Sequence, residues 1–420
     1  MEALDHAVAG GTHLRAGSGR SAAVRSQSPG RTAVKIEISE TDRHERELTR
    51  KQADLLRASQ LVGITQVHGS RTRWTLTAKR KVGVARVGDI ELWITPKLPI
   101  KRLLFMLDFA HKRQGWLPDE AKVGEADGLV STVATLLVTQ VDRALSQGPL
   151  QGYRHVDEQS YVLRGRVQTA AHIQLHHGTT SRLDVTHDDL VTDTVENRIL
   201  LSTIRKVLDL PRVDEGVRLR LAAHQAQLTR VCSPIRGPRL PVWTPGKPNL
   251  RYQPALRLAE LIWRSCSPEY GSGGVEVNGF LFQLDQVFED FVCLALKELL
   301  EQRHGGRASL QHTMPLDDPR SVGLRPDLMW RDETRTGVVD AKYMVDRSNP
   351  RTELFQMLAY CTVLGTRTGH LIYAGGSEHA DRRRIVNSDI TVVSHSLRLD
   401  TQPAEVLEQL TAIADEIAGQ

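Results

Sequence analysis

Three residues in the C-terminal third have the types and spacing that metal-assisted hydrolysis needs. Asp340 and Lys342 stand two positions apart, directly after a Val-Val pair. Side chains alternate between the two faces of a strand, so we expect both residues to point the same way. Asp327 lies thirteen positions before Asp340, and a hairpin loop through the polar residues 331–335 would bring its carboxylate beside that of Asp340. The pattern predicts two carboxylates and an amine at one strand end.

Two neighbouring carboxylates repel each other. A hard divalent cation relieves this repulsion and keeps waters that a substrate phosphate can replace. We therefore expect Mg²⁺, or Mn²⁺ in its place, at Asp327 and Asp340. The amine of Lys342 could orient or deprotonate an attacking water and offset charge on the reacting phosphate. The predicted chemistry is hydrolysis of a phosphodiester bond.

Further polar residues flank this set on predicted helices. Glu289 lies beside the apolar face of the preceding helix, from where it could be a third acidic ligand. Gln356 and Tyr360 share one face of the following helix because they are four positions apart. Each alone is more often a solvated or packing side chain, and an isolated Asp-x-Lys is more often a surface ion pair. Their order along the chain is what indicates an active site.

The elements that must position these residues follow a plain order. Periodicity predicts a long helix over residues 280–303 and a closing helix over residues 403–418, with one further helix between them. That further helix is expected at 351–364. The β segments are expected at 308–314, 326–330 and 336–342 before it, and at 369–374 and 390–399 after it. This order is typical of an α/β core with a mixed sheet flanked by helices.

The chain of 420 residues is long enough for several domains. Residues 1–31 are rich in Gly, Ser and Arg and predict a flexible tail, whose deletion should change stability little. We expect an N-terminal α/β domain over 33–150, in which a strand at 33–39 leads into a charged helix through Arg57. Strands at 72–79, 81–87 and 89–95, with a hairpin turn at Gly88-Asp89, and helices at 103–114 and 129–145 complete it. A largely helical middle domain and linker over 151–274, with helices near 193–209, 215–231 and 254–266, precedes the C-terminal domain over 275–420.

Composition limits the functional classes. The formal net charge of +5 is a mild excess, which permits a polyanionic partner without demonstrating one. We find no apolar stretch long enough to span a bilayer and no secretory leader, and so expect a cytoplasmic protein. The four cysteines have no C-x-x-C pair, so we expect buried or inert thiols rather than a zinc or iron–sulfur site; they are Cys232, Cys266, Cys293 and Cys361.

Taken together, these motifs resemble a known group of enzymes. The C-terminal third is similar to the PD-(D/E)-x-K nuclease superfamily, in the branch with a Gln-x-x-x-Tyr helix. The wider chain, roughly residues 80 to 375, resembles the McrC family, the endonuclease subunits of McrBC restriction systems. The segments that carry this wider likeness are 82–84, 94–97, 152–154, 163–166, 193–198, 280–282, 288–291, 325–327, 340–342 and 356–360.

The resemblance implies a function and a partner. It implies a DNA endonuclease acting on DNA that contains modified cytosine (5-methylcytosine), together with an AAA+ GTPase of the McrB type. The family's metal-binding and catalytic positions fall on Asp327, Asp340 and Lys342, with Glu289 as an addition. We expect little cleavage and no GTPase activity from the chain alone, and the main contact with the motor through residues 33–150, with the hairpin at Gly88-Asp89 a candidate contact. No membrane partner is expected.

Two other functions stay open at this point, as do several weaker sites. The chain could be a non-catalytic adaptor that activates the motor, or a stand-alone nuclease of the RecB or Cas4 kind. His172, His176 and His177 have a spacing that a transition metal could use, although surface histidines are the commoner interpretation. Gly246-Lys247 lacks the other residues of a phosphate loop. Three arginines could contact DNA or the partner, although arginines beside strands are usually solvated; they are Arg154, Arg164 and Arg166.

Overall fold

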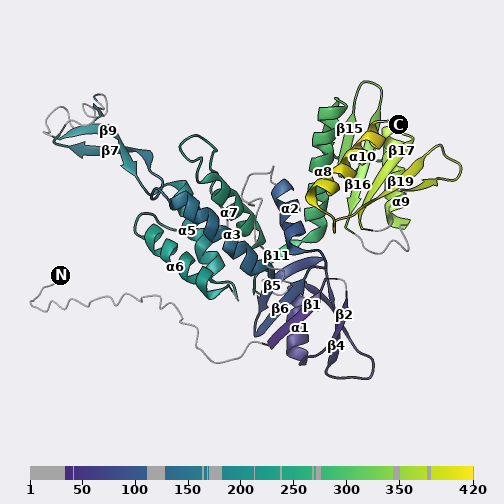
Figure 1. The fold of residues 1–420 in the computed structure, drawn as a ribbon, viewed down its shortest axis with the longest axis horizontal. Helices are drawn as coiled ribbons and strands as arrows, with labels where there is room; N and C mark the ends of the chain where they lie inside the picture. Colours follow the sequence, from purple (N-terminus) through teal and green to yellow (C-terminus); the bar gives the residue numbers. More distant parts are fainter. Residues whose placement is uncertain are drawn as a thin grey trace, which may run out of the picture.

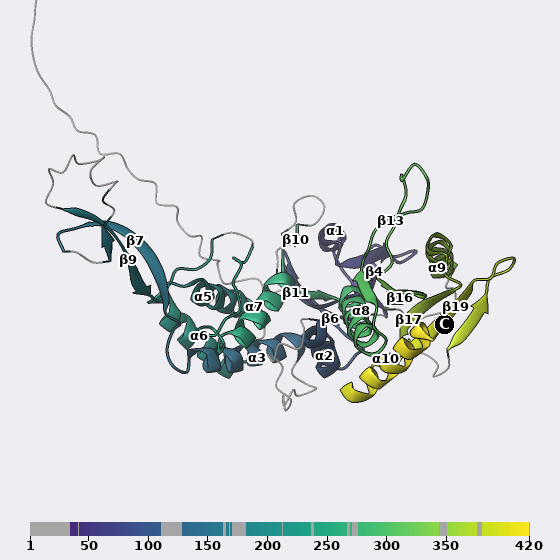
Figure 2. The same cartoon turned by 90° about the horizontal axis from the view of Figure 1, so that it is seen from above.

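The computed structural model describes most of the chain between residues 34 and 419. Residues outside the description are 1–33, 41, 111–127, 163–164, 168, 170–181, 212, 237–238, 267–268, 271–275, 344–350, 376–379 and 420. The described parts lie in a row: a β-strand arm with helices, then a five-stranded sheet, then a six-stranded sheet (Figure 1, Figure 2). Among the described residues, no helix has the length and apolar character that crossing a bilayer requires. The predicted multi-domain α/β class is confirmed.

The five-stranded sheet has the order β1-β6-β5-β11-β10. Its strands are β1 (Val34–Ser39), β5 (Lys81–Val87), β6 (Ile90–Thr95), β10 (Glu269–Tyr270) and β11 (Glu276–Gln283). Strand β1 runs parallel to β6, and the other neighbours are antiparallel. The predicted hairpin is confirmed, and its turn residue Gly88 has the positive φ of 61° that favours glycine.

Strand β11 corrects one sequence prediction. The helix expected from Phe280 begins only at Leu284, and helix α8 spans Leu284–Arg303. Phe280 and Phe282 are buried, whereas Leu281 between them is only partly buried, which is the alternation of a strand. The neighbouring chain comes very close here, since a Cβ atom at Gly83 on β5 would collide with the Phe280 carbonyl oxygen.

A second correction concerns the charged stretch before Arg57, which is not one helix. It contains strand β2 (Arg43–Glu47), and helix α1 (Arg50–Ser59) follows a capping box at Thr49. Strand β2 is an exposed edge of the sheet β2-β4-β3, where charged side chains are tolerated. Strand β3 (Val62–Gln66) was not predicted, and β4 (Arg73–Ala78) was.

Helices dominate the middle of the chain, and an arm projects from them. Helix α2 (Ile100–Ala110) packs on α8, and α3 (Gly128–Leu145) packs on α6 and α7. The predicted middle helices are confirmed as α5 (Val195–Leu208), α6 (Glu215–Thr229) and α7 (Gln253–Ser265). The arm was not predicted, because its strands are polar on both faces; they are β7 (Gly152–Ser160), β8 (Arg166–Val167) and β9 (Leu183–Val191).

The six-stranded sheet has the order β12-β15-β16-β17-β19-β18, with parallel pairs at β16-β17 and β17-β19. Helices α8 and α10 (Pro403–Ala418) pack together on one side, and α9 (Arg351–Leu364) packs on the other. Its strands are β12 (Arg307–Leu310), β15 (Leu328–Arg331), β16 (Thr336–Lys342), β17 (Thr368–Ala374), β18 (Asp381–Arg384) and β19 (Thr391–Leu397), with a separate pair β13 (Met314–Pro315) and β14 (Gly323–Leu324). This is the predicted mixed sheet between helices, with β18 as an unpredicted edge strand.

The boundary predicted between residues 274 and 275 falls inside the five-stranded sheet. Strands β10 and β11 lie on either side of it, and β11 pairs with β5 over seven residue pairs from Val277 to Gln283. One continuous apolar core joins this sheet to α8 and the six-stranded sheet. The chain therefore passes from the first sheet into the C-terminal part at the junction of β11 and α8.

Two buried histidines face each other between neighbouring strands of the second sheet. His370 Nδ1 on β17 and His395 Nε2 on β19 are 3.0 Å apart, and the rings are stacked with centroids 5.3 Å apart. Burial lowers the pKa of His370 to about 3 and that of His395 to about 4; His395 adds to the first shift and Arg382 to both. The pair therefore stays neutral in the folded protein at pH values where free histidine is charged.

This pair predicts that stability declines in mild acid. In the unfolded chain both histidines bind protons below about pH 6.5, whereas the folded chain does not, so the contribution of this pair to the free energy of unfolding falls as the pH drops from about 6.5 to about 4. Each histidine contributes at most about 1.4 kcal/mol per pH unit. Urea unfolding at about pH 7.5 and pH 5 measures it. The double variant His370→Gln, His395→Gln should lose less stability between the two pH values; an equal loss would contradict the assignment.

Candidate active site

Strand β16 ends with the first two predicted site residues. Asp340 and Lys342 lie on the same face of the strand, and Lys342 Nζ is 2.6 Å from Asp340 Oδ2. The parallel neighbour β17 pairs with both positions, which fixes the backbone that carries them. Val338 and Val339 anchor the strand, since they are buried in two different apolar clusters on its opposite faces. The period-two expectation for Asp340 and Lys342 is confirmed as geometry.

Asp327 lies directly before β15 and reaches the same strand end. Its Oδ2 accepts a hydrogen bond of 2.9 Å from the backbone N–H of Ala341 and lies 3.9 Å from Lys342 Nζ. The expected hairpin between β15 and β16 is present. Its loop is closed by Asp332, whose carboxylate accepts hydrogen bonds from the backbone N–H groups of Thr334 and Arg335.

The electrostatics of this strand end are unusual for carboxyl groups. Asp340 is 1% exposed; burial, and then the charge of Asp327, raise its pKa to about 7. Glu289 on α8 belongs to the same group, since burial and the charge of Asp327 raise its pKa to about 7 as well. Burial alone would lower the pKa of Lys342, but the carboxylates of Asp340, Asp327 and Glu289 outweigh it and raise the pKa. Lys342 is therefore the protonated partner of a crowded acidic group.

Helix α9 supports the loop that carries Asp327. Gln356 Nε2 donates a hydrogen bond of 2.6 Å to the hydroxyl of Tyr360, as their shared helix face predicts. The Tyr360 hydroxyl in turn donates to the backbone carbonyl of Arg325 at 3.1 Å. Tyr360 is 1% exposed, and burial raises its pKa to about 12, so it remains a donor. Gln356 and Tyr360 therefore hold the turn before Asp327.

Asp327 and Asp340 are the protein groups at this strand end that could bind a cation. Among the described residues neither oxygen of the buried Asp340 accepts a well-aligned hydrogen bond, but Oδ2 lies 2.6 Å from Lys342 Nζ, so Oδ1 is the less engaged of the two. Within the part of the chain that the structure describes, however, no three His, Cys, Asp or Glu side chains converge closely enough to hold one ion. Asp327 and Asp340 would fit a hard divalent cation, whose remaining ligands could be water and substrate oxygens.

Sequence reasoning missed Arg80, Glu40 and Tyr343, which border this site. Asp285 lies one turn before Glu289 on α8, and its Oδ2 is 3.1 Å from Arg80 Nη1 in the turn between β4 and β5. Glu40 follows β1 and accepts a hydrogen bond of 2.9 Å from the Tyr343 hydroxyl. The only local sequence signal was the position of Tyr343, directly after Lys342. Arg80 and Glu40 come from a different sheet, and no local pattern links them to the site.

The weaker predicted sites lie elsewhere. Arg154 and Arg166 stand on the arm, far from the carboxylates (Figure 1), whereas Arg164 and the three histidines at 172, 176 and 177 are outside the described residues. The Gly246 N–H donates to the side chain of Asn249, which closes that loop on itself. The four cysteines are free and buried, as predicted.

Comparison with known proteins assigns the chain to a family. Residues 76–374 match the family model described as McrBC 5-methylcytosine restriction system component. The chain belongs to this family. The match includes the whole strand end with Asp327, Asp340 and Lys342, and also the arm and the first sheet from β5 onward. Curated proteins gave no match.

Two of the solved structures that match this McrBC family member come from Thermococcus gammatolerans. One is the refined half-complex from the tetradecameric assembly of Thermococcus gammatolerans McrB AAA+ hexamers with bound McrC, with a TM-score of 0.62 and 18% identity. That match covers 91% of this chain and 100% of the other. The cryo-EM structure of the Thermococcus gammatolerans McrBC complex matches with a TM-score of 0.44 and 19% identity, over 64% of this chain and 88% of that chain.

The buried carboxylate of this McrBC family member predicts a stability cost. Ionisation of Asp340 is easier in the unfolded chain, where the pKa is near 3.8, so it favours unfolding as the pH rises from about 4 to about 7. Asp340→Asn should therefore raise the free energy of unfolding by about 1 to 3 kcal/mol at about pH 8 and by less at pH 5. Denaturant unfolding at both pH values measures it.

The matched control is Asp332→Asn in the loop between β15 and β16. Hydrogen bonds from Thr334 and then Arg335 lower the pKa of Asp332 to about 2, so the same substitution there should destabilise the protein. If both variants change stability in the same direction, the buried charge of Asp340 is not the cause.

Proposed function

We propose that this chain is the DNA endonuclease subunit of a modification-dependent restriction system. It would hydrolyse phosphodiester bonds with a divalent metal, in DNA that contains modified cytosine such as 5-methylcytosine. The observation that carries the proposal is the convergence of Asp327, Asp340 and Lys342 at one strand end, with Glu289 beside them, in a member of the McrBC family. Gln356 and Tyr360 would position the loop before Asp327 rather than touch the substrate.

The two aspartates and Lys342 would have different roles in hydrolysis. Asp327 and Asp340 would hold Mg²⁺ or Mn²⁺, with Glu289 on α8 as a further acidic group. Such an ion lowers the pKa of a bound water and neutralises charge on the phosphate. Lys342 has a raised pKa and stays protonated at neutral pH, which favours the stabilisation of developing negative charge over the removal of a proton.

The partner is the second part of the proposal. The similar archaeal McrC is described as bound to McrB AAA+ hexamers. We propose that this chain likewise works with an AAA+ GTPase of the McrB type, which supplies nucleotide hydrolysis and reads the modified base. Residues 33–150 remain our candidate for the main contact. Cleavage should then require both GTP and the motor.

Variants at the strand end test the catalytic assignment. Asp340→Asn and Lys342→Met should lower the cleavage rate at least 100-fold in the presence of Mg²⁺, the motor and GTP. Lys297→Met is the matched control, because Lys297 lies on α8 and pairs with Glu301 instead. It should cleave at the wild-type rate.

Three outcomes separate the alternatives. Wild-type cleavage by the Asp340 variant would remove this residue from the active site. Absence of cleavage by the wild-type complex, with intact stimulation of the motor's GTPase, would favour the adaptor. Robust cleavage by the chain alone would favour a stand-alone nuclease.

A basic turn beside the site offers a contact for the DNA backbone. The carboxylates near the strand end repel a polyanion, so cations must flank them. Lys79 and Arg80 are exposed in the turn between β4 and β5, and the Arg80 carbonyl accepts a hydrogen bond of 3.0 Å from the N–H of Leu284 at the start of α8. Among the described residues Lys79 makes no ion pair. Its ammonium is therefore available to a phosphate.

Lys79→Ala should weaken DNA binding equally for all sequences. The slope of log affinity against log salt should become shallower by about 1. Fluorescence anisotropy with a DNA duplex in EDTA measures it without cleavage. Lys51→Ala is the control. Lys51 is exposed on α1, and Leu55 of the same helix packs near Gly88, which is at the opposite end of β5 from Lys79 and Arg80. Equal slopes for the two variants would argue against this contact.

A further inference from the structure

A buried carboxylate joins the five-stranded sheet to the strand that carries the catalytic residues. Glu40 is 5% exposed and follows β1. Its Oε1 accepts two hydrogen bonds, one of 3.0 Å from the backbone N–H of Lys97 and one of 2.9 Å from the Tyr343 hydroxyl. Its Oε2 has no hydrogen-bond partner among the described residues. A buried carboxylate with one unsatisfied oxygen is costly, and burial raises its pKa, so its presence calls for an explanation.

Tyr343 connects this carboxylate to both sides of the site. It follows Lys342 directly at the end of β16 and is 7% exposed. Its ring lies 5.9 Å from that of Phe288, centroid to centroid, and Phe288 precedes Glu289 on α8. A shift of the tyrosine would therefore move the ends of two elements, the strand with Lys342 and the helix with Glu289.

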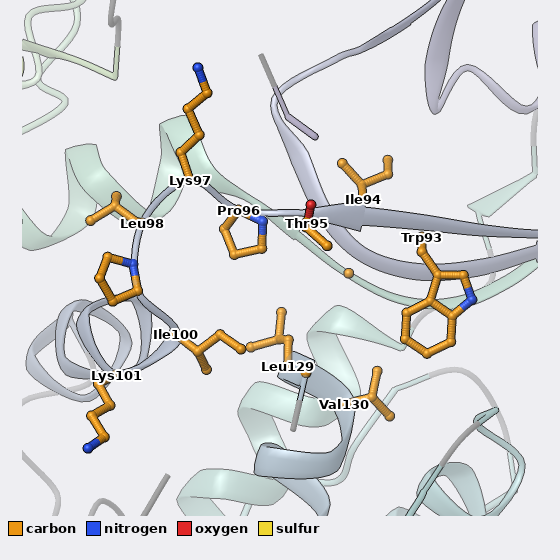
Figure 3. A pocket seen from close by; sticks show the side chains of 13 residues that line it. Trp93, Ile94, Thr95, Pro96, Lys97, Leu98, Ile100, Lys101, Leu129 and Val130 are labelled. Carbon is orange, nitrogen blue, oxygen red and sulfur yellow. The ribbon is translucent and has the colours of Figure 1, made fainter. Parts of the chain in front are cut away.

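The other hydrogen bond to Glu40 is donated by Lys97, in the loop between β6 and α2. Residues 96–99 connect β6 to α2, and this loop lines a cavity of about 520 Å³ together with Trp93, Ile100 and the start of α3 (Figure 3). Ile100 and Leu129 face each other across this cavity, while the Lys97 side chain points away from it (Figure 3). Lys97 Nζ lies 3.6 Å from Asp42, two residues after Glu40. Loop and carboxylate are thus held to each other at two points.

We propose that Glu40 is a positioning residue for the hydrolysis, acting through Tyr343. The carboxylate fixes the tyrosine hydroxyl, the tyrosine fixes the end of β16, and Lys342 is thereby held against Asp340. The first sheet thus takes part in the chemistry through one side chain that touches neither metal nor DNA. This role rests on the proposed function, because it concerns the geometry of that reaction.

The proposed role makes a distinct kinetic prediction. A small displacement of a catalytic group lowers the rate of the chemical step without lowering the affinity for DNA. Tyr343→Phe removes only the hydroxyl and should lower kcat at least tenfold, with the KM for DNA unchanged within about twofold. Glu40→Ala should do the same. Glu40→Gln keeps an oxygen that accepts both hydrogen bonds and should restore kcat to within about threefold of the wild type.

The control removes a comparable hydroxyl elsewhere. Tyr252 is buried like Tyr343, and its hydroxyl accepts from the Leu150 N–H at 2.8 Å and donates to Asn197 at 2.9 Å. Tyr252→Phe should lower the melting temperature about as much as Tyr343→Phe and leave kcat unchanged. All variants are assayed as full chains with saturating motor, GTP, Mg²⁺ and a methylated duplex.

The outcomes are distinguishable. If the wild type cleaves, Asp340→Asn does not, and Tyr343→Phe keeps the wild-type kcat, the positioning role is wrong while the proposed function stands. A raised KM with unchanged kcat would also overturn the role, and so would failure of Glu40→Gln to recover. If the wild type does not cleave at all, the proposed function fails and the role with it. Should Glu40→Ala not fold, Tyr343→Phe and Glu40→Gln decide the question.

Discussion

The burial of one carboxylate, Asp340, is the constraint on which the rest of the structure depends. An isolated charge at this depth would be too costly, and the ammonium of Lys342 lies 2.6 Å from the carboxylate. The surrounding elements serve this arrangement. The pairing of β16 with β15 and β17 fixes the strand, and the contact of Asp327 with Ala341 draws the second carboxylate in. Helix α9 holds the preceding turn through Tyr360.

The site is not confined to one sheet. The turn with Arg80 reaches Asp285 on α8, and Glu40 reaches the end of β16, so the first sheet borders the carboxylates at two points. The pairing of β5 with β11 explains how this is possible, because β11 continues directly into α8. The direct strand-to-helix junction therefore connects the first sheet to the helix that carries Glu289.

The sequence predicted the parts of this site that local rules govern. The alternation of a strand placed Asp340 beside Lys342, a hairpin loop brought Asp327 to them, and helix spacing paired Gln356 with Tyr360. Prediction from the sequence failed where a contact joins residues far apart in the chain, and where the hydrophobic patterns of two neighbouring elements run together. Glu40 and Tyr343 are 303 positions apart, a distance that no periodicity encodes. The aromatic run of β11 merges with the apolar face of α8, and the pattern predicted one helix where a strand and a helix meet.

The path of the chain has a consequence for how such a protein can change. The backbone leaves the first sheet after β6 and returns to it at β10 and β11, and helices α2, α3, α5, α6 and α7 and the arm lie in between (Figure 2). In topological terms this region is an insertion between two strands that share the neighbour β5. Its length and its outer surface can vary over generations without shifting the register of any strand that borders the carboxylates. The outer surface of the inserted region and the geometry of the carboxylates can therefore change independently of each other.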